Sequence, residues 1–182
     1  MKWIDGTWEK ALSSWEELLQ EELPGREVSI DGAIHSIRNM GEVMFVILRK
    51  KEGLFQTVFD NPRENPYAHG LKEGMTVEIS GNLREEKRAP HGREIQIQHL
   101  TVLSAPAAPL PMAIDKWELH TSLEAKLNQR SVSLRNIKER ARFRIQEGLV
   151  RAFRDYLYQQ GFTEIHTPKI GARGAEGGAN LF

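Results

Sequence analysis

The sequence predicts an all-β barrel followed by a mainly helical segment, and two patterns carry this prediction. From about residue 26 to residue 104, apolar residues recur in five short segments, mostly with the two-residue period of half-buried strands. A stretch rich in Pro, Asn and Gly interrupts the series between the third and fourth segments. Five short strands with an insertion at this point fit a five-stranded Greek-key barrel, the OB-fold. The pattern alone fits an SH3-like barrel or a β-sandwich nearly as well.

Each predicted strand has its own signal. The first alternates Val28, Ile30 and Ile34 with polar or small residues, whereas the second is apolar at every position. Gly53 precedes the third strand and marks a hairpin turn. The insertion predicts a short helical turn rather than a strand. The predicted strands are residues 28–35, 43–48, 54–59, 77–83 and 95–103, with the insertion at 60–74.

An amphipathic helix is expected within residues 1–25. A 3.6-residue period aligns apolar side chains on one face, namely Trp8, Leu12, Trp15, Leu18 and Leu19. Pro24 and Gly25 would end this helix. We expect the apolar stripe to pack on the barrel, and a partner-binding helix is the alternative.

A hinge and a helical region are predicted after the barrel. Residues 105–120 begin with a Pro- and Ala-rich spacer that should be extended. A polar helix is expected around residues 121–130, and a long helix from about 137 to 160 should follow it. Asn136 would cap the long helix and Gly161 would end it. Its apolar face holds Ile145, Leu149, Ala152, Phe153, Tyr156 and Leu157.

The last segment is predicted to be a strand and a loop. Phe162, Ile165 and Thr167 suggest a short strand, which Pro168 would break. A glycine-rich, loop-like stretch then runs to residue 182.

The composition narrows the function classes. The 182 residues carry 25 basic and 25 acidic side chains, so any binding to nucleic acid must use a local patch. The absence of cysteine excludes disulfide scaffolds, cysteine-bound zinc and thiol nucleophiles. The histidines lack ligand spacing, and the sequence has neither a P-loop nor a nucleophile elbow, so we expect no metal and no cofactor in this chain. With no apolar run long enough for a membrane and no secretory leader, a cytoplasmic protein is expected.

The first three predicted strands carry the side chains best suited to bind nucleic acid. Because strand 43–48 is apolar throughout, one of its faces should form the core and the other an apolar or aromatic surface. An OB-fold stacks unpaired bases on such a surface. Phe45 is the candidate stacking residue, with Arg38 beside it, and Gln56 offers a donor and an acceptor to one base edge. Candidate contacts to the RNA backbone are Arg49, Arg84, Lys87, Arg88 and Arg93.

These candidates also have ordinary structural explanations. Phe45 could belong to the core, and Gln56 could be a simple exposed strand residue. The loop at 84–93 could be a solvated hairpin, because Glu85, Glu86 and Glu94 offset its positive charge.

Several motifs that occur in family order support the nucleic-acid interpretation. The segment GAIHSIRNMGEVMFVILRKKEGLFQTVF, with the spacing R-x2-G-x3-F-x2-L-R-x3-G-x2-Q, resembles the anticodon-binding OB-fold of class IIb aminoacyl-tRNA synthetases, especially the aspartyl type. KRAPHGREIQI resembles the hairpin between strands four and five of that domain, and PLP the hinge after it. LNQRSVSLR, QQGFTEIHTPKI and GAEGGANLF resemble the start of the catalytic domain, motif 1 and the following loop. The resemblance covers residues 26–182.

The resemblance implies a tRNA partner with a central U in its anticodon. Phe45 would stack on that uracil and Gln56 would read its edge. Arg38 would contact the anticodon loop nearby, and Glu94 would help to read a flanking base. In the catalytic part, Glu176 would lie in the loop over the amino acid.

The resemblance also implies dimerisation and a division of the chain. Motif 1 would form a homodimer interface, here with Phe153, Leu157 and Pro168. The domains would be the N-terminal helix, the anticodon-binding OB-fold, the hinge and the start of the catalytic domain, at 1–25, 26–104, 105–120 and 121–182.

The family attaches aspartate or asparagine to tRNA with ATP and Mg²⁺. Its motifs 2 and 3, which hold ATP, do not occur in these 182 residues, so we expect this chain alone to be inactive in adenylate formation. The expected function is anticodon binding. The alternative is a dimerising protein-interaction module that does not bind tRNA.

Overall fold

The computed structural model of the chain describes residues 3–4, 7–8, 12–19 and 25–167. The chain divides into two compact units, residues 1–137 and residues 138–182. The barrel lies in the first unit, and nearly all of the long helix lies in the second.

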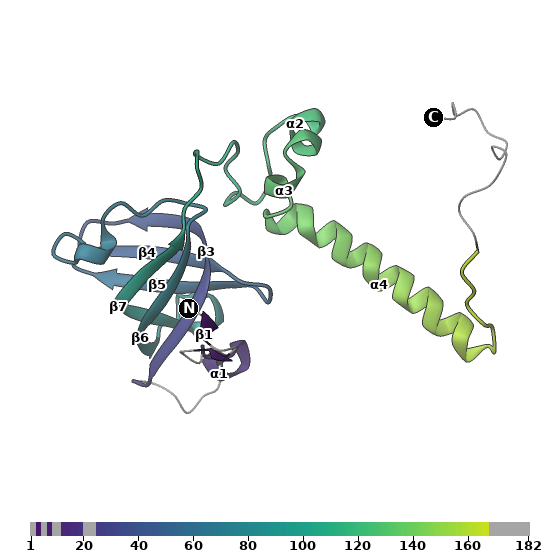
Figure 1. Cartoon of the computed structure of the whole chain (residues 1–182), viewed down its shortest axis with the longest axis horizontal. Helices are drawn as coiled ribbons and strands as arrows, with labels where there is room; N and C mark the ends of the chain where they lie inside the picture. The colour runs from purple at the N-terminus through teal and green to yellow at the C-terminus, as the bar shows by residue number, and fades with distance from the viewer. Residues whose placement is uncertain (1–2, 5–6, 9–11, 20–24, 168–182) are drawn as a thin grey trace. The chain divides into compact units, whose positions relative to one another are not determined.

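Five strands close into a barrel, which confirms the OB-fold prediction (Figure 1). The order around the barrel is β3-β4-β5-β7-β6, and the two ends meet through antiparallel pairing of β3 with β6. Among the five barrel strands that the structure describes, only β5 and β7 pair in parallel. The strands are β3 (Glu27–Asn39), β4 (Val43–Arg49), β5 (Leu54–Asp60), β6 (Thr76–Glu85) and β7 (Arg93–Ser104).

Strand β4 shows how an apolar run is divided between two faces. Met44, Val46 and Leu48 are buried, whereas Phe45 and Ile47 between them are only partly buried. Because successive side chains of a strand point to opposite faces, the first three line the core and the other two face outward. The core that they enter also holds both fully buried phenylalanines of β5, Phe55 and Phe59.

Strands β6 and β7 approach each other closely at Gly81 of β6. The register of β6 against β7 shifts between Ser80 and Gly81, which brings the two backbones close together. A Cβ atom on Gly81 would overlap the carbonyl oxygen of Gln96 and lie 3.1 Å from the backbone nitrogen of Gln98. Only glycine therefore fits this position without moving backbone.

The N-terminal helix is shorter than the periodicity predicts. Trp8 lies in the two-residue strand β2 (Thr7–Trp8), paired with β1 (Trp3–Ile4), and α1 covers only Trp15–Leu19. Trp3 pairs with Trp8 and Ile4 with Thr7, and this pairing replaces the helix that the apolar period predicts at Trp8.

A capping box fixes where α1 begins. The Ser14 hydroxyl accepts from the Glu17 N–H at 3.1 Å, and the Glu17 carboxylate accepts from the Ser14 N–H at 2.8 Å. The helix packs on the barrel through Leu18, which is fully buried, and through Trp15, whose ring lies nearly perpendicular to that of Phe55 with the ring centroids 5.8 Å apart. The expected packing of this segment on the barrel is therefore observed.

The connections on the barrel agree with the turn signals. The 3₁₀ turn η1 (Pro66–Ala68) lies in the insertion, where a short helical turn was expected. The β6–β7 hairpin contains a second 3₁₀ turn, η2 (Pro90–Gly92), in which His91 has a positive φ of 67°.

The region after the hinge is helical, as predicted. The polar helix is divided into α2 (Leu123–Asn128), capped by the Ser122 hydroxyl, and α3 (Arg130–Ser133). The long helix α4 covers Ile137–Gln159. The side chain of Asn136 donates from Nδ2 to the carbonyls of Ile114 and Lys116 at 3.0 and 2.6 Å, which ties the start of α4 to the hinge. Among the described helices none is long and apolar enough to cross a bilayer.

Gly161 ends α4 as predicted, but the strand expected after it is absent. Gly161 has a φ of 81°, and its N–H donates to the Tyr158 carbonyl at 3.0 Å. Residues 162–167 form no strand. A strand needs a neighbour to pair with, and no described segment pairs with these residues.

Candidate nucleic-acid interface

The predicted stacking residue lies on the outer face of the barrel. Phe45 pairs across the sheet with Arg38 of β3 on one side and Val58 of β5 on the other. One step along the same face, Ile47 pairs with Gln56. Since residues directly opposite each other share a face, the structure brings Arg38, Phe45 and Gln56 together on one surface. Phe45 is partly exposed and Arg38 is exposed there.

Gln56 is held by a buried acid. Its Nε2 donates to Oε2 of Glu94 at 2.7 Å, across to β7. The other carboxylate oxygen of Glu94 accepts from Nε of Arg84 at 2.7 Å. Glu94 is 1% exposed, so both of its oxygens are used inside the protein. Glu94 therefore contacts Gln56 directly, a contact that the sequence did not indicate.

Asp60 holds the far side of the same arginine. Its carboxylate accepts from the two terminal nitrogens of Arg84 at 3.1 and 3.5 Å. It also accepts from Nε2 of Gln96 at 2.6 Å. We call the five connected residues the polar relay: Gln56, Glu94, Arg84, Asp60 and Gln96.

The relay keeps Arg84 charged. Burial of the guanidinium would lower its pKa, but hydrogen bonds and charges from Glu94 and then Asp60 outweigh it, so the pKa of Arg84 is raised. Arg84 is therefore the cation that links the side chains of Glu94 and Asp60.

The basic candidates do not form one loop cluster. Arg84 lies in β6 and Arg93 in β7, rather than in the loop between them, and Arg93 is only 8% exposed. Lys87 and Arg88 are exposed in the hairpin loop, and Arg49 is partly buried at the end of β4. Accessible positive charge near the outer face thus comes mainly from Arg38, Lys87 and Arg88.

A hollow continues the outer face beside Gln56. It has a volume of about 380 Å³. Its wall includes Arg38 and Gln56 from the barrel, Arg88 from the hairpin loop, and Lys116 and Trp117 from the hinge. Trp117 is 71% exposed. The hollow therefore places cations and an exposed aromatic ring next to the carboxamide.

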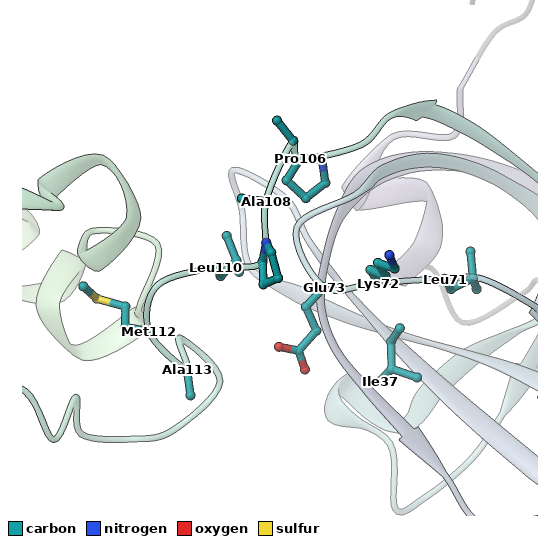
Figure 2. Close-up of a pocket in the computed structure, with 11 residues that line it drawn as sticks. Ile37, Leu71, Lys72, Glu73, Pro106, Ala108, Leu110, Met112 and Ala113 are labelled. Atoms are coloured by element: carbon teal, nitrogen blue, oxygen red, sulfur yellow. The ribbon is translucent and has the colours of Figure 1, made fainter.

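A second hollow, about 560 Å³, lies where the hinge meets the barrel (Figure 2). Ile37, Leu71 and the hinge residues Leu110 and Met112 give it a largely apolar wall. Leu110 packs closely against Gly74. A Cβ atom on Gly74 would lie 3.3 Å from Cδ2 and 3.4 Å from Cγ of Leu110. This hollow marks packing of the hinge on the barrel and contains none of the predicted base-reading residues.

The remaining predicted residues belong to the C-terminal region. Phe153 and Leu157 lie on α4, where Phe153 is 65% exposed. Pro168 and Glu176 lie outside the described residues. Among the residues that the structure does describe, His, Asp and Glu form no cluster of three that could hold a metal ion.

Comparison with protein families identifies the two regions of the chain. Residues 28–103 match a family model described as an OB-fold nucleic acid binding domain of the tRNA anticodon type. Residues 122–182 match the model for class II tRNA synthetases of the D, K and N group. The chain therefore combines an anticodon-binding OB domain with a class II tRNA synthetase region. The resemblance seen in the sequence motifs is therefore confirmed at the level of the family.

Individual relatives agree with the family. The chain is 41% identical over 167 residues to an aspartate–tRNA(Asp/Asn) ligase of Deinococcus radiodurans, and 38% identical over 161 residues to one of Thermus thermophilus. These alignments cover 90% and 87% of this chain, but only 37% and 36% of the relatives. The asparaginyl-tRNA synthetase of Pyrococcus horikoshii, solved with asparaginyl-adenylate, has a TM-score of 0.78 at 26% identity, over 94% of this chain and 40% of that structure. This chain thus spans less than two fifths of the curated relatives.

Proposed function

We propose that the outer face of β4 and β5 binds the anticodon loop of a tRNA with a central uracil. The observation that carries this proposal is the position of Phe45, an aromatic ring on the outer face between Arg38 and Val58. A base laid on such a ring gains about 1–3 kcal/mol. Gln56, one step along the sheet, presents the carboxamide that would read the base edge.

The anticodon stem-loop is the direct probe of this function. A fluorescent RNA stem-loop with a central U should bind to the purified chain, as measured by anisotropy, and one with a central C should bind more weakly. A base that cannot pair with Gln56 leaves buried polar groups without partners, which costs affinity. If neither loop binds, the proposal is wrong.

The RNA backbone should contribute a salt-dependent part of the affinity. Each phosphate neutralised on a single strand contributes about −0.7 to the slope of log K against log salt. With two to four such contacts from Arg38, Lys87, Arg88 and Arg49, we expect a slope between about −1.4 and −2.8.

Single substitutions in the hairpin loop test this prediction. Lys87→Ala and Arg88→Ala should each reduce the slope by about 0.7 and weaken the U and C loops equally. Lys72→Ala is the matched control, because Lys72 is an exposed cation on the hinge side of the barrel. A slope near zero in the parent chain would contradict the backbone contacts.

We propose further that the complete protein joins aspartate, or asparagine, to tRNA in the cytoplasm. The relatives are aspartate–tRNA(Asp/Asn) ligases, and a solved neighbour holds asparaginyl-adenylate. ATP and Mg²⁺ would serve this reaction in the catalytic part of such an enzyme. The anticodon-binding face would contribute by positioning the tRNA.

A second proposal concerns α4, which we expect to form a homodimer. Its apolar face is exposed, with Ile145 at 64%, Leu149 at 67%, Phe153 at 65% and Tyr156 at 61%. An exposed stripe of this kind marks an interaction surface. This surface also fits the alternative function, a dimerising module that does not bind tRNA, and the RNA measurement separates the two.

The mass in solution tests the dimer. Light scattering should give a dimer for the parent chain and a monomer for Leu149→Glu, because a buried unpaired carboxylate is costly. Tyr158→Glu is the matched control, since helical spacing puts Tyr158 on the opposite side of α4, 81% exposed. A monomeric parent at high concentration would overturn the dimer.

A further inference from the structure

The direction of the Gln56 carboxamide is fixed by its chemical partner. A carboxylate only accepts hydrogen bonds, so the end of Gln56 that faces Glu94 must be its NH₂ group. The structure has this arrangement, with Nε2 of Gln56 2.7 Å from Oε2 of Glu94. The carbonyl Oε1 and the second N–H of Gln56 are then presented in a fixed order.

This order matters for the choice between the two pyrimidines. Uracil offers an N–H donor at position 3 and an oxygen acceptor at position 4, whereas cytosine offers an acceptor at position 3 and an amino donor at position 4. A carboxamide in one orientation pairs with one of these edges, and after a half-turn it pairs with the other. Whatever prevents the half-turn of Gln56 therefore sets the specificity.

Glu94 can prevent the half-turn only if its own carboxylate is held. Arg84 donates from Nε to Oε1 of Glu94 at 2.7 Å, opposite the oxygen that Gln56 uses. Arg84 is in turn held by Asp60 through both terminal nitrogens, at 3.1 and 3.5 Å. Gln96 donates to the same Asp60 carboxylate at 2.6 Å. The chain of contacts begins at Asp60 and ends at the atoms that would meet the base.

We propose that Asp60 is a positioning residue that sets the preference for uracil over cytosine, by holding Arg84, Glu94 and the Gln56 carboxamide in one orientation. This inference rests on the proposed anticodon function and makes Asp60 a specificity determinant that does not touch the base. Asp60 follows Gln56 and Val58 on the same face of β5, so its side chain reaches the relay from the end of the strand.

Binding of two stem-loops, with a central U or a central C, tests the inference. In Asp60→Asn, one amide oxygen cannot hold both nitrogens of Arg84 as the carboxylate does, so the relay loosens. The preference for U over C should fall about five- to tenfold, the effect of losing one well-placed hydrogen bond. Asp31→Asn is the matched control, because Asp31 forms an ion pair with Lys50 at 2.9 Å and does not belong to the relay. This control variant should leave the preference unchanged.

A second variant probes the same orientation from the other end. In Glu94→Gln the new side chain can donate as well as accept, so it permits the half-turn of Gln56. Binding of the C loop should therefore become stronger relative to the U loop. A merely structural role of these residues would weaken both loops by the same factor and would leave the ratio unchanged.

The outcomes separate this inference from the proposed function. If the parent prefers the U loop and both relay variants lose the preference, the inference holds. If the parent prefers the U loop and both variants keep that preference, the inference is wrong and the anticodon function stands. If the parent binds neither loop, both fail.

Discussion

Replacing Phe45 with alanine should weaken binding of the central-U stem-loop by about 1–3 kcal/mol, or about 5- to 150-fold in Kd. The Phe45 ring lies on the outer face of β4, whereas the neighbouring residues in the sequence, Met44 and Val46, point to the core. Its removal should therefore reduce the stacking platform while leaving the core intact. Anisotropy titrations give the loss in affinity, and thermal unfolding checks that the fold is preserved.

Two further variants at the same position distinguish stacking from simple apolar contact. Phe45→Trp keeps a flat ring and should retain the affinity, whereas Phe45→Leu keeps apolar volume without a ring and should lose most of it. An alanine variant that binds as tightly as the parent would mean that Phe45 is not the platform.

Replacing Gly81 with alanine should destabilise the barrel by more than about 3 kcal/mol, at the upper end of the cost of overpacking. The added Cβ would overlap the carbonyl oxygen of Gln96, which belongs to the backbone of the neighbouring strand. A flexible side chain could move aside, but β7 cannot move without breaking its pairing with β5 and β6. Denaturant unfolding measures the loss.

Gly53→Ala is the control for this prediction. A Cβ on Gly53 would lie 3.4 Å from the indole of Trp15, an ordinary contact, and Gly53 has no positive φ. We expect its stability to change by less than about 1 kcal/mol. Equal stability of Gly81→Ala and the parent would show that the two strands are not packed as closely as the structure has them.

The barrel could be predicted from the sequence because its signals are local. The alternation in 28–35 and 77–83, the hairpin glycine at 53 and the insertion at 60–74 each report on a short segment. The end of α4 at Gly161 could also be predicted, because the position after a helix often has the left-handed backbone conformation that favours glycine.

The outward position of Phe45 could not be decided from the pattern. Strand 43–48 is apolar at every position, so either set of alternate residues could have formed the core. In the structure Met44, Val46 and Leu48 take the core, and Phe45 is left on the outer face. Only the resemblance to known synthetases indicated that choice in advance.

The predictions of a helix that includes Trp8 and of a strand within residues 162–167 were wrong. In both places the pairing of one segment with another, rather than the sequence of the segment itself, decides whether a strand forms. Trp8 belongs to a two-residue strand, because Trp3 pairs with it. Residues 162–167 have strand-forming residues but pair with no described segment, so they form no strand.

Asp60 was missed although a signal existed. Alternation along β5 places residue 60 on the same face as Gln56 and Val58. What the sequence could not show is the distance from Asp60 to Arg84, because their strands, β5 and β6, are not neighbours in the barrel and lie on either side of β7. A contact between β5 and β6 depends on the order of the strands in the barrel, which no local pattern reports.

Photo-crosslinking tests the central claim most directly. A stem-loop with 5-iodouracil at the central anticodon position is irradiated with the chain, and the crosslinked tryptic peptide is identified by mass spectrometry. Since 5-iodouracil reacts with an aromatic ring that it stacks on, the crosslink should fall in residues 39–49, at Phe45, and should be lost in Phe45→Leu. A crosslink confined to α4 or to the N-terminal segment, or one that persists in Phe45→Leu, would contradict the account.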